Sequence, residues 1–309
     1  MTAYEVSHSL MGRPRKNGPG WLVLCPVHGD RHPSLSLRDG EGGRLLVKCF
    51  SGCDAREILK TLAEMGLLDG SPKTVSTPEE KNTDTKRKAD RTSDLWNASN
   101  PITTGDPVWL YLKSRGIVLD AWPEDLRCHS SLGYWETSDA GKPIKTGVFP
   151  CLLAVVRSPQ GRPVGIHRTW VRPDGSGKAP VSSPKKLFKV HDLSGSAIRL
   201  FSPENGTIGI TEGLETALSV NILYGEPVWA CVSAHGMASF VPPEGVSTVR
   251  VFADHDGNET GLKAALKSYD RLAKEGRTVE IRQPREIGDY NDELIKKPGL
   301  ACWPDRAKE

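Results

Sequence analysis

The chain has 309 residues, of which 37% are hydrophobic and 26% are charged, and its formal net charge is +3. This length predicts two or three domains with packed cores, and so small a net charge does not by itself indicate a nucleic-acid partner. The sequence has no apolar run near the length of a membrane helix and no signal-peptide core in residues 1–10, so we expect a cytoplasmic protein without a membrane partner.

Residues 1–68 carry a cluster of cysteine and histidine residues. The spacing is Cys25-x2-His28 and then, after twenty residues, Cys49-x3-Cys53. Two chelating pairs of this kind suit one tetrahedral zinc ion and leave no open coordination position, so we predict one structural zinc. His32 is an alternative to His28, although the two-residue gap after Cys25 favours His28. The other alternative is a group of unrelated cysteines beside a surface histidine.

A short helix is expected after the cluster. Asp54 is placed to cap its N-terminus, and Glu57 is placed to complete a capping box. Ile58, Leu62 and Met65 have helical spacing and would form one apolar face.

The four cysteines outside the cluster are scattered along the chain: Cys128, Cys151, Cys231 and Cys302. In a reducing compartment such residues are usually small buried apolar side chains.

Residues 69–94 are rich in Lys, Asp, Glu, Thr and Ser and have almost no apolar residues after Val75. Such a stretch cannot bury enough surface to offset the entropy of ordering it. We therefore predict a flexible linker that separates residues 1–68 from the rest of the chain.

Residues 95–200 are expected to start with a helix near Trp109 and to continue as strands. An apolar run covers residues 151–156, a Ser-Pro-Gln-Gly turn follows at 158–161, and residues 164–172 alternate in polarity. Gly177 and Lys178 do not belong to a P-loop, because arginine and alanine occupy the positions of its first glycine and its Ser/Thr. We therefore predict no ATPase module here.

Within this segment, residues 162–189 contain seven lysines and arginines but one acidic residue, Asp174. A local positive charge with interleaved aromatic residues is typical of a surface that follows a phosphate backbone. The candidate nucleic-acid or nucleotide-binding residues are His167, Arg168, Trp170, Arg172, Lys178, Lys185, Lys186 and Lys189. The alternative is a solvated basic strand and loop without a ligand.

Residues 201–309 alternate between strands and helices. Strands are expected at 207–211, 228–233, 248–254 and 278–283, and helices at 214–223 and 260–274. This alternation predicts a mainly parallel α/β sheet.

Acidic residues follow two of these strands. Glu212 ends the first strand, and Asp254 and Asp256 end the third. Because ligands bind at the carboxyl ends of parallel strands, these three carboxylates predict a site for Mg²⁺ or Mn²⁺. Asp289 and Asp292 follow the last strand and are further candidate ligands, and the pattern does not say which of the two binds metal.

The motifs at both ends of the chain resemble those of one family. Cys-Pro-Val-His at 25–28, His-Pro-Ser-Leu-Ser-Leu at 32–37 and Cys-Phe-Ser-Gly-Cys at 49–53 resemble the zinc ribbon of DnaG-type primases. Three residues separate the last two cysteines, where the replicative enzymes usually have two, and this spacing is similar to the branch from phages, plasmids and integrated elements. The Glu-Gly at 212–213 and the Asp-His-Asp at 254–256 resemble a Toprim domain over about residues 208–294.

The resemblance implies a multi-domain α+β and α/β protein with a zinc ribbon (1–68), a flexible linker (69–94), a basic primase-core subdomain (95–200) and a Rossmann-like Toprim domain (201–309). It implies a DNA primase that makes short RNA primers on single-stranded DNA from ribonucleoside triphosphates, beside a separate replicative helicase. Glu212, Asp254 and Asp256 would be the catalytic residues. A non-catalytic single-strand-binding replication protein and a Toprim nuclease are the alternatives, and the zinc ribbon favours a primase over a nuclease.

Overall fold

The computed structural model describes residues 2–10, 13–28, 30, 32–40, 44–68, 78–138, 142–257 and 259–297. The chain divides into two compact units, residues 1–82 and 83–309. Among the described residues, no helix is long and apolar enough to cross a membrane.

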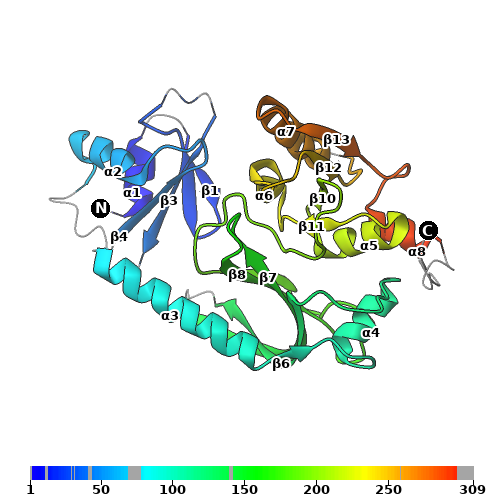
Figure 1. Ribbon diagram of the computed structural model, residues 1–309. Helices are drawn as coiled ribbons and strands as arrows, with labels where there is room; N and C mark the ends of the chain where they lie inside the picture. Colours follow the sequence, from blue (N-terminus) through cyan, green and yellow to red (C-terminus); the bar gives the residue numbers. More distant parts are fainter. Residues whose placement is uncertain are drawn as a thin grey trace. The chain divides into compact units, whose positions relative to one another are not determined.

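The first unit contains a four-stranded antiparallel sheet with helices before and after it (Figure 1). Its elements are α1 (Ala3–Ser9), β1 (Arg15–Asn17), β2 (Gly20–Val23), β3 (Leu35–Gly40), β4 (Arg44–Cys49) and α2 (Ala55–Glu64). The strands lie in the order β1-β2-β3-β4. Val6 of α1, Leu35 and Leu37 of β3, and Ile58 and Leu62 of α2 are fully buried and form the core.

The helix predicted after the cysteine cluster is confirmed as α2. Asp54 caps it and accepts a hydrogen bond from the backbone N–H of Arg56 at 2.8 Å. Two details of the prediction are wrong. Asp54 does not pair with Glu57 in a capping box, and Met65 is 49% exposed because it lies at the C-cap, where the helix ends.

The predicted flexible linker is corrected by the structure. Residues 69–77 lie outside the described residues, but Pro78–Asn97 form the long helix α3 (Figure 1). No glycine or proline interrupts residues 79–97, and Asp84 pairs with Arg87 at 2.9 Å and Lys88 at 2.5 Å, one helical turn away. The prediction weighed only the lack of apolar residues and overlooked these stabilising i,i+3 and i,i+4 pairs.

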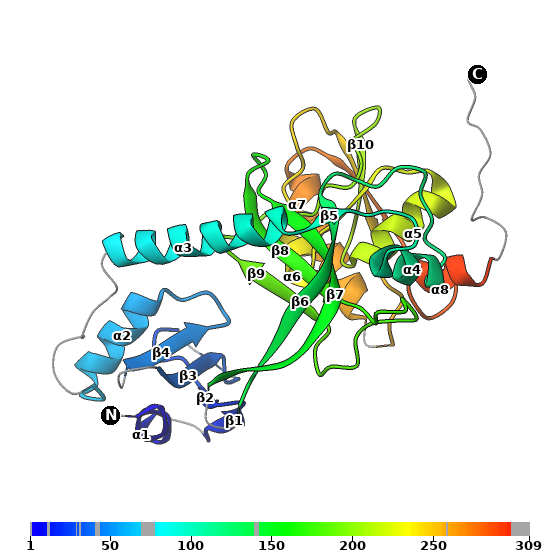
Figure 2. The same ribbon diagram turned by 90° about the horizontal axis from the view of Figure 1, so that it is seen from below.

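A five-stranded antiparallel sheet opens the second unit (Figure 2). Its strands are β5 (Asn100–Pro101), β6 (Leu126–Thr137), β7 (Pro143–Arg157), β8 (Pro163–Trp170) and β9 (Lys185–Lys189), in that order, and α4 (Pro107–Ser114) lies between β5 and β6 in the chain. Leu152 and Ala154 of β7 pack on the α4 side, whereas Cys151 and Leu153 pack on the opposite side near Trp96 of α3. The sheet is therefore covered on both faces.

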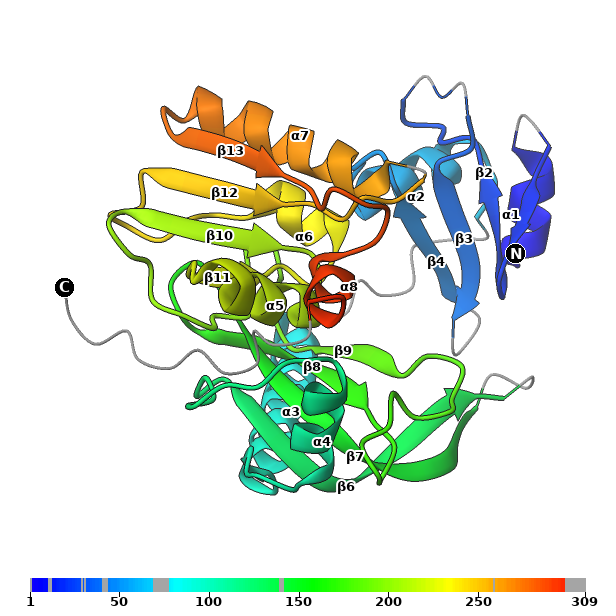
Figure 3. The ribbon, with the colours of Figure 1, turned by 90° about the vertical axis from the view of Figure 1, so that its right-hand side faces the viewer.

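A four-stranded parallel sheet follows, with strand order β11-β10-β12-β13 (Figure 3). Its elements are β10 (Thr207–Thr211), α5 (Leu214–Tyr224), β11 (Val228–Ala230), α6 (Ala234–Ser239), β12 (Thr248–Phe252), α7 (Thr260–Lys274), β13 (Thr278–Arg282) and α8 (Tyr290–Ile295). Helices α5 and α8 cover one face, and α6 and α7 cover the other. The predicted parallel α/β sheet is confirmed; the short helix α6 was not predicted.

The buried face of α7 differs from the one that the helical spacing of Leu262, Leu266, Tyr269 and Leu272 predicts. Leu272 is buried, but Leu266 and Tyr269 are 47% and 43% exposed. The helix instead packs its small residues against the sheet, including Ala264 and Ala265. The second and third apolar residues of the periodic pattern therefore face outward, because small side chains allow a closer approach between helix and sheet.

Buried cysteines outside the zinc cluster agree with the sequence prediction. Cys128, Cys151 and Cys231 are free thiols with at most 5% of their surface exposed. Cys302 lies outside the described residues.

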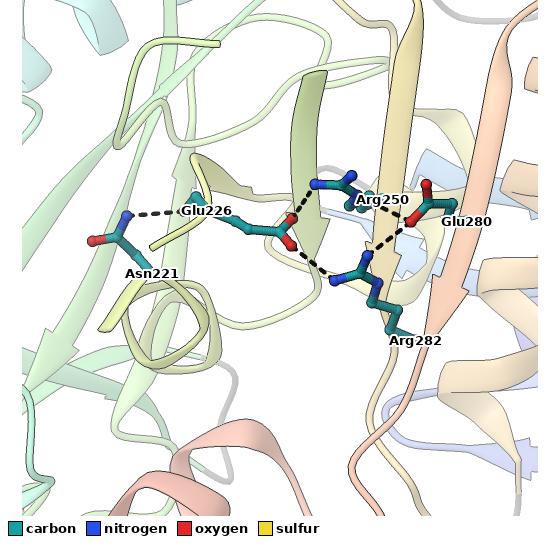
Figure 4. Close-up of polar contacts among 5 residues, drawn as sticks. All are labelled: Asn221, Glu226, Arg250, Glu280 and Arg282. Atoms are coloured by element: carbon teal, nitrogen blue, oxygen red, sulfur yellow. Dashed lines mark hydrogen bonds and ion pairs between the residues drawn. The ribbon is translucent and has the colours of Figure 1, made fainter. Parts of the chain in front are cut away.

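The parallel sheet carries a network of four charged residues (Figure 4). Glu226 accepts from Arg250 at 2.9 Å and from Arg282 at 2.8 Å. Glu280 accepts from the same arginines at 3.0 and 2.9 Å, and the backbone carbonyl of Glu226 accepts from Asn221. The network joins β12, β13 and the segment before β11, so it ties three parts of the sheet together.

Replacing Glu226 by Gln should weaken this network. Glu226 has only 14% of its side chain exposed, and its loss would leave Arg250 and Arg282 with one shared carboxylate. We expect the free energy of unfolding to fall by about 1–2 kcal/mol. Urea unfolding measures the change, with the exposed Glu244→Gln as the matched control. Equal stability of the two variants would contradict a structural role for the network.

Candidate functional site

Four predicted zinc ligands converge in the first unit. The ligand atoms of Cys25, His28, Cys49 and Cys53 all lie within 4.8 Å of one another. His28 Nδ1 is 3.1 Å from Cys53 Sγ, so this ring nitrogen faces the thiols. Three thiolates and one imidazole at these separations fit a single tetrahedral zinc ion, which such ligands bind at about 2.0–2.3 Å.

Asp30 supports this cluster and was not predicted from the sequence. Its carboxylate lies 2.6 Å from His28 Nε2, on the side of the ring away from the thiols. The same carboxylate accepts from the Ser34 hydroxyl at 2.6 Å and from the Cys25 backbone N–H at 2.8 Å. An acceptor behind a metal-binding histidine fixes the ring orientation and its tautomer. The feature of the sequence that could have identified Asp30 is its position two residues after His28.

The predicted acidic cluster lies at the carboxyl edge of the parallel sheet. Glu212 directly follows β10, and Asp254 and Asp256 follow the adjacent strand β12. The Oδ1 atoms of Asp254 and Asp256 are buried and have no hydrogen-bond partner in the described part of the chain. Buried carboxylate oxygens without a donor are costly, and hard oxygen ligands of this kind suit Mg²⁺ or Mn²⁺.

The carboxylates of this cluster disfavour one another's ionisation. Burial, together with the charges of Asp289, Glu212 and Asp256, raises the pKa of Asp254 to about 6. Burial also raises the pKa of Glu212, and the charge of Asp256 adds to this effect. Among the described residues, however, these carboxylates do not come together as a compact metal-binding group in the way that the cysteines and His28 do. The acidic site is therefore more open than the zinc cluster.

Backbone groups hold the acidic cluster in place. The backbone of Ala234, at the start of α6, opposes the rise in the pKa of Glu212. The Gly261 N–H, in the first turn of α7, donates to Asp256 Oδ2 at 3.4 Å. A Cβ on Gly261 would lie 2.9 Å from the Asp254 carbonyl oxygen, so only glycine permits this close approach.

The two candidate ligands after β13 have different surroundings. Asp289 and Asp292 form the capping box of α8, in which each side chain accepts from the other's backbone N–H. A bridge between His255 and Gly288 brings Asp289 next to the acidic cluster. Its charge contributes to the raised pKa of Asp254. This favours Asp289 as the additional metal ligand.

Lys185 connects the basic segment to the acidic cluster. Its Nζ lies 2.7 Å from Glu215 Oε2, and the charge of Lys185 also favours the ionised forms of Glu212 and Asp254. Tyr111 of α4 donates to the other oxygen of Glu215 at 2.8 Å. Burial opposes the charge of Glu215, but Lys185 outweighs it and lowers the pKa of Glu215 to about 2.

Glu215 and Tyr111 were not predicted as site residues. Glu215 lies three residues after Glu212 in α5 and is 5% exposed, and Tyr111 is 1% exposed. A glutamate in the first turn of a helix is usually solvated, and its negative charge stabilises the helix by interacting with the positive end of the helix dipole. Only the contacts of Glu215 with Tyr111 of α4 and Lys185 of β9 distinguish it from such a solvated helix residue.

The other predicted basic-segment residues fall into three groups. Lys178 lies close enough to favour the ionised form of Glu215, and His167 faces the same network. His167 is buried, which lowers its pKa to about 4. It is therefore a neutral imidazole at pH 7, and its buried Nδ1 has no partner in the described part of the chain.

The second group points to the opposite face of the sheet. Trp170 is 1% exposed and donates from its indole to the Leu132 carbonyl at 3.2 Å. Arg168 packs over the Trp170 and Phe188 rings at 4.9 and 5.5 Å. Lys186 donates to the Trp135 carbonyl at 2.5 Å. Trp170 belongs to the core, so its ring is not available for stacking on a base, which corrects the prediction for that residue.

The last two predicted residues lie on the surface away from these contacts. Arg172 is exposed in the turn after β8, and Lys189 is exposed at the end of β9, where it lies 3.7 Å from Asp192. The structure therefore does not bring either residue to the acidic cluster.

Comparisons with known proteins agree with the α/β part of this description. Residues 207–298 match the family described as a Toprim domain, and residues 86–200 match a domain of unknown function (DUF7146). The Toprim prediction is therefore confirmed for this region. No curated protein matches the sequence.

Several solved structures are similar to the chain. The Aquifex aeolicus primase (zinc-binding and RNA polymerase domains) is 16% identical with a TM-score of 0.44, and the match covers 96% of this chain and 82% of that one. The DnaG catalytic core is 11% identical with a TM-score of 0.45, covering 69% and 76%. The primase fragment of the bacteriophage T7 primase-helicase is 15% identical with a TM-score of 0.37, covering 85% and 90%.

Replacing Asp30 by Asn should weaken zinc binding without removing a ligand. The amide would accept more weakly from His28 Nε2, and we expect about 10- to 100-fold lower zinc affinity. Chelator competition measures this, and metal analysis should find one zinc per wild-type chain. Asp54→Asn is the matched control because asparagine also caps helices well. Unchanged zinc affinity in Asp30→Asn, or no zinc in the wild type, would contradict the assignment.

Replacing Glu215 by Gln should destabilise the second unit in a pH-dependent way. At pH 7 the variant loses the ionic partner of Lys185, and we expect the free energy of unfolding to fall by about 2 kcal/mol. The pKa of Glu215 in the folded chain is lowered to about 2 from 4.5. Its stabilising effect is therefore full above pH 4.5 and is lost as the pH falls towards 2.

The measurement is urea unfolding of wild type and Glu215→Gln at several pH values. The difference between them should shrink as the pH is lowered, whereas the exposed Glu204→Gln should match the wild type throughout. A difference that stays constant with pH would show that the Glu215 carboxylate is not held ionised by Lys185.

Proposed function

We propose that this chain is a primase that synthesises short RNA primers on single-stranded DNA by divalent-metal-dependent nucleotidyl transfer. The observation that carries the proposal is the pair of buried, unpartnered carboxylate oxygens of Asp254 and Asp256 beside Glu212, in a Toprim domain. Lys185 lies next to this cluster. Carboxylates and a fixed cation side by side suit chemistry on a phosphate group.

The carboxylates and the lysine would have separate roles. Glu212, Asp254 and Asp256, with Asp289, would hold Mg²⁺ or Mn²⁺, which when bound supplies activation of a 3′-hydroxyl and stabilisation of the leaving pyrophosphate. Lys185 would contact the triphosphate of the incoming nucleotide, and Lys178 would add positive charge behind it. Glu215 and Tyr111 would orient Lys185 without touching substrate.

The zinc cluster would have a structural role in the first unit. Its four ligands leave no open coordination position for a substrate, so its zinc would be structural. We propose that residues 1–68 contact the single-stranded template, that ribonucleoside triphosphates are the substrates, and that a separate replicative helicase is the partner. A non-catalytic single-strand-binding protein and a nuclease are the competing functions, and ribonucleotide incorporation, strand binding and strand cleavage measured together separate all three.

Replacing Asp254 and Asp256 together by Asn should abolish primer synthesis. The change removes two metal ligands, and we expect at least a 100-fold loss of dinucleotide formation on single-stranded DNA with Mg²⁺ or Mn²⁺. Binding of single strands should stay equal or become tighter, because negative charge next to a polyanion is removed. Labelled ribonucleotide incorporation and fluorescence anisotropy measure the two properties.

Asp270→Asn, on the exposed side of α7, is the matched control and should retain synthesis. Synthesis by the double variant would contradict the site assignment. A wild type that incorporates no ribonucleotide but still binds single strands would favour the accessory protein, and cleavage of the strand would favour the nuclease.

A further inference from the structure

The hairpin of β6 and β7 carries an exposed tryptophan that the proposed site does not use. Trp135 is 52% exposed, and Val148 on the neighbouring strand is 46% exposed. A flat indole of this exposure offers a large apolar surface together with a polar N–H. Such a side chain is a candidate contact for a ligand with an aromatic face.

Strand pairing places a lysine beside this tryptophan. Trp135 pairs with Lys145, and Gly133 pairs with Val148. A Cβ on Gly133 would lie 3.2 Å from Trp135 Nε1 and 3.1 Å from Lys145 Cε, so both side chains converge over the glycine. Directly paired residues point to the same side of a sheet. Gly133, Trp135, Lys145 and Val148 therefore form one surface, here named the hairpin face.

The intervening residues point to the opposite face and fix the backbone. Tyr134 is fully buried, and Glu136 accepts from the Ser182 hydroxyl at 2.5 Å. Lys186 Nζ lies 3.9 Å from the Tyr134 ring centroid and donates to the Trp135 carbonyl. The negative charge of Glu136 is thus kept off the hairpin face, whose four residues carry one positive charge.

The hairpin face continues into the face that carries Lys185. Val148 and Leu152 are four residues apart in β7, so their side chains point to the same side. Leu152 pairs with Thr169 of β8, which in turn pairs with Lys185 of β9. Trp135 and Lys185 therefore point to the same side of the sheet, with the buried Leu152 and Thr169 between them.

We propose that the hairpin face is a binding site for single-stranded nucleic acid, with one base stacked on Trp135 and a phosphate next to Lys145. Stacking on an aromatic side chain accepts every base, and a nearby lysine supplies the attraction to the backbone. The ligand class follows from the pairing of an exposed aromatic ring with a cation on a face whose four named residues include no carboxylate. The proposal rests on the proposed handling of single strands but does not require primer synthesis.

The test measures binding of the full chain to a fluorescent oligodeoxythymidine without added Mg²⁺, Mn²⁺ or nucleotide. Trp135→Ala should bind about 5- to 150-fold more weakly, the range expected for one lost base–aromatic stack. Trp135→Phe should stay within about threefold of the wild type, because phenylalanine also stacks. Tyr269→Ala removes an aromatic residue of similar exposure, 43%, from α7 and should leave binding unchanged.

An abasic oligomer of the same length separates stacking from other effects. Trp135→Ala should bind this oligomer as the wild type does, because there is no base to stack. Equal weakening on both oligomers, or wild-type affinity of Trp135→Ala for oligodeoxythymidine, would overturn the proposal. Wild-type affinity of Trp135→Ala for oligodeoxythymidine would also be expected if the hairpin face binds a protein instead.

Lys145→Ala tests the phosphate contact separately. The slope of log affinity against log salt concentration should become shallower by about 0.7, the value for one phosphate contact on a single strand. Lys267→Ala, an exposed lysine on α7, should leave the slope unchanged. An unaltered slope in Lys145→Ala would remove Lys145 from the site. Failure of primer synthesis in the wild type leaves all these binding measurements interpretable, so the two proposals can fail independently.

Discussion

The crowding of buried carboxylates at the carboxyl edge of the parallel sheet is the constraint on which the second unit depends. Glu212, Asp254 and Asp256 come from the ends of two adjacent strands, and the loop after β13 adds Asp289. Like charges in a partly buried site repel one another, as the raised pKa of Asp254 reflects. A fold keeps such an arrangement only where the surrounding groups, or a bound cation, offset the cost.

The chain offsets part of this cost with its own groups. The Gly261 backbone N–H in the first turn of α7 donates to Asp256, and the backbone of Ala234 at the start of α6 opposes the rise in the pKa of Glu212. Lys185 adds a positive charge from the neighbouring antiparallel sheet and is itself held by Glu215. Side chains of α4, β7 and α5 also share one apolar core, which packs the two sheets of the second unit together. The polar link and the shared core thus both connect the two sheets beside the acidic cluster.

The two metal sites of the chain have different physical characters. The zinc cluster combines soft thiolates with an imidazole, and the fold alone places its four donor atoms close together. The acidic site uses oxygen atoms that stand further apart and are partly unpartnered. The first arrangement suits a permanent structural ion, and the second suits an ion that arrives with substrate phosphates.

Several features could be predicted from the sequence because they depend on residues close together in the chain. The zinc ligands follow from two short chelating pairs, and Asp254 and Asp256 follow from their place directly after a periodic strand. The bounds of β10 and α7 were predicted to the residue for the same reason. Alternation between apolar and polar residues locates an element even when its neighbours are unknown.

Only the tertiary structure decided which face of each element is buried and which distant groups meet. The alternating pattern of β8 shows that Trp170 and Arg168 point to one side and His167 to the other. It does not show that the side of Trp170 is covered, or that the side of His167 meets the Glu215 network. Glu215 became a site residue only through its contacts with Lys185 and Tyr111, which are 30 and 104 positions away in the chain. The physical reason is that a local pattern specifies a periodicity, whereas burial and pairing depend on what packs against it.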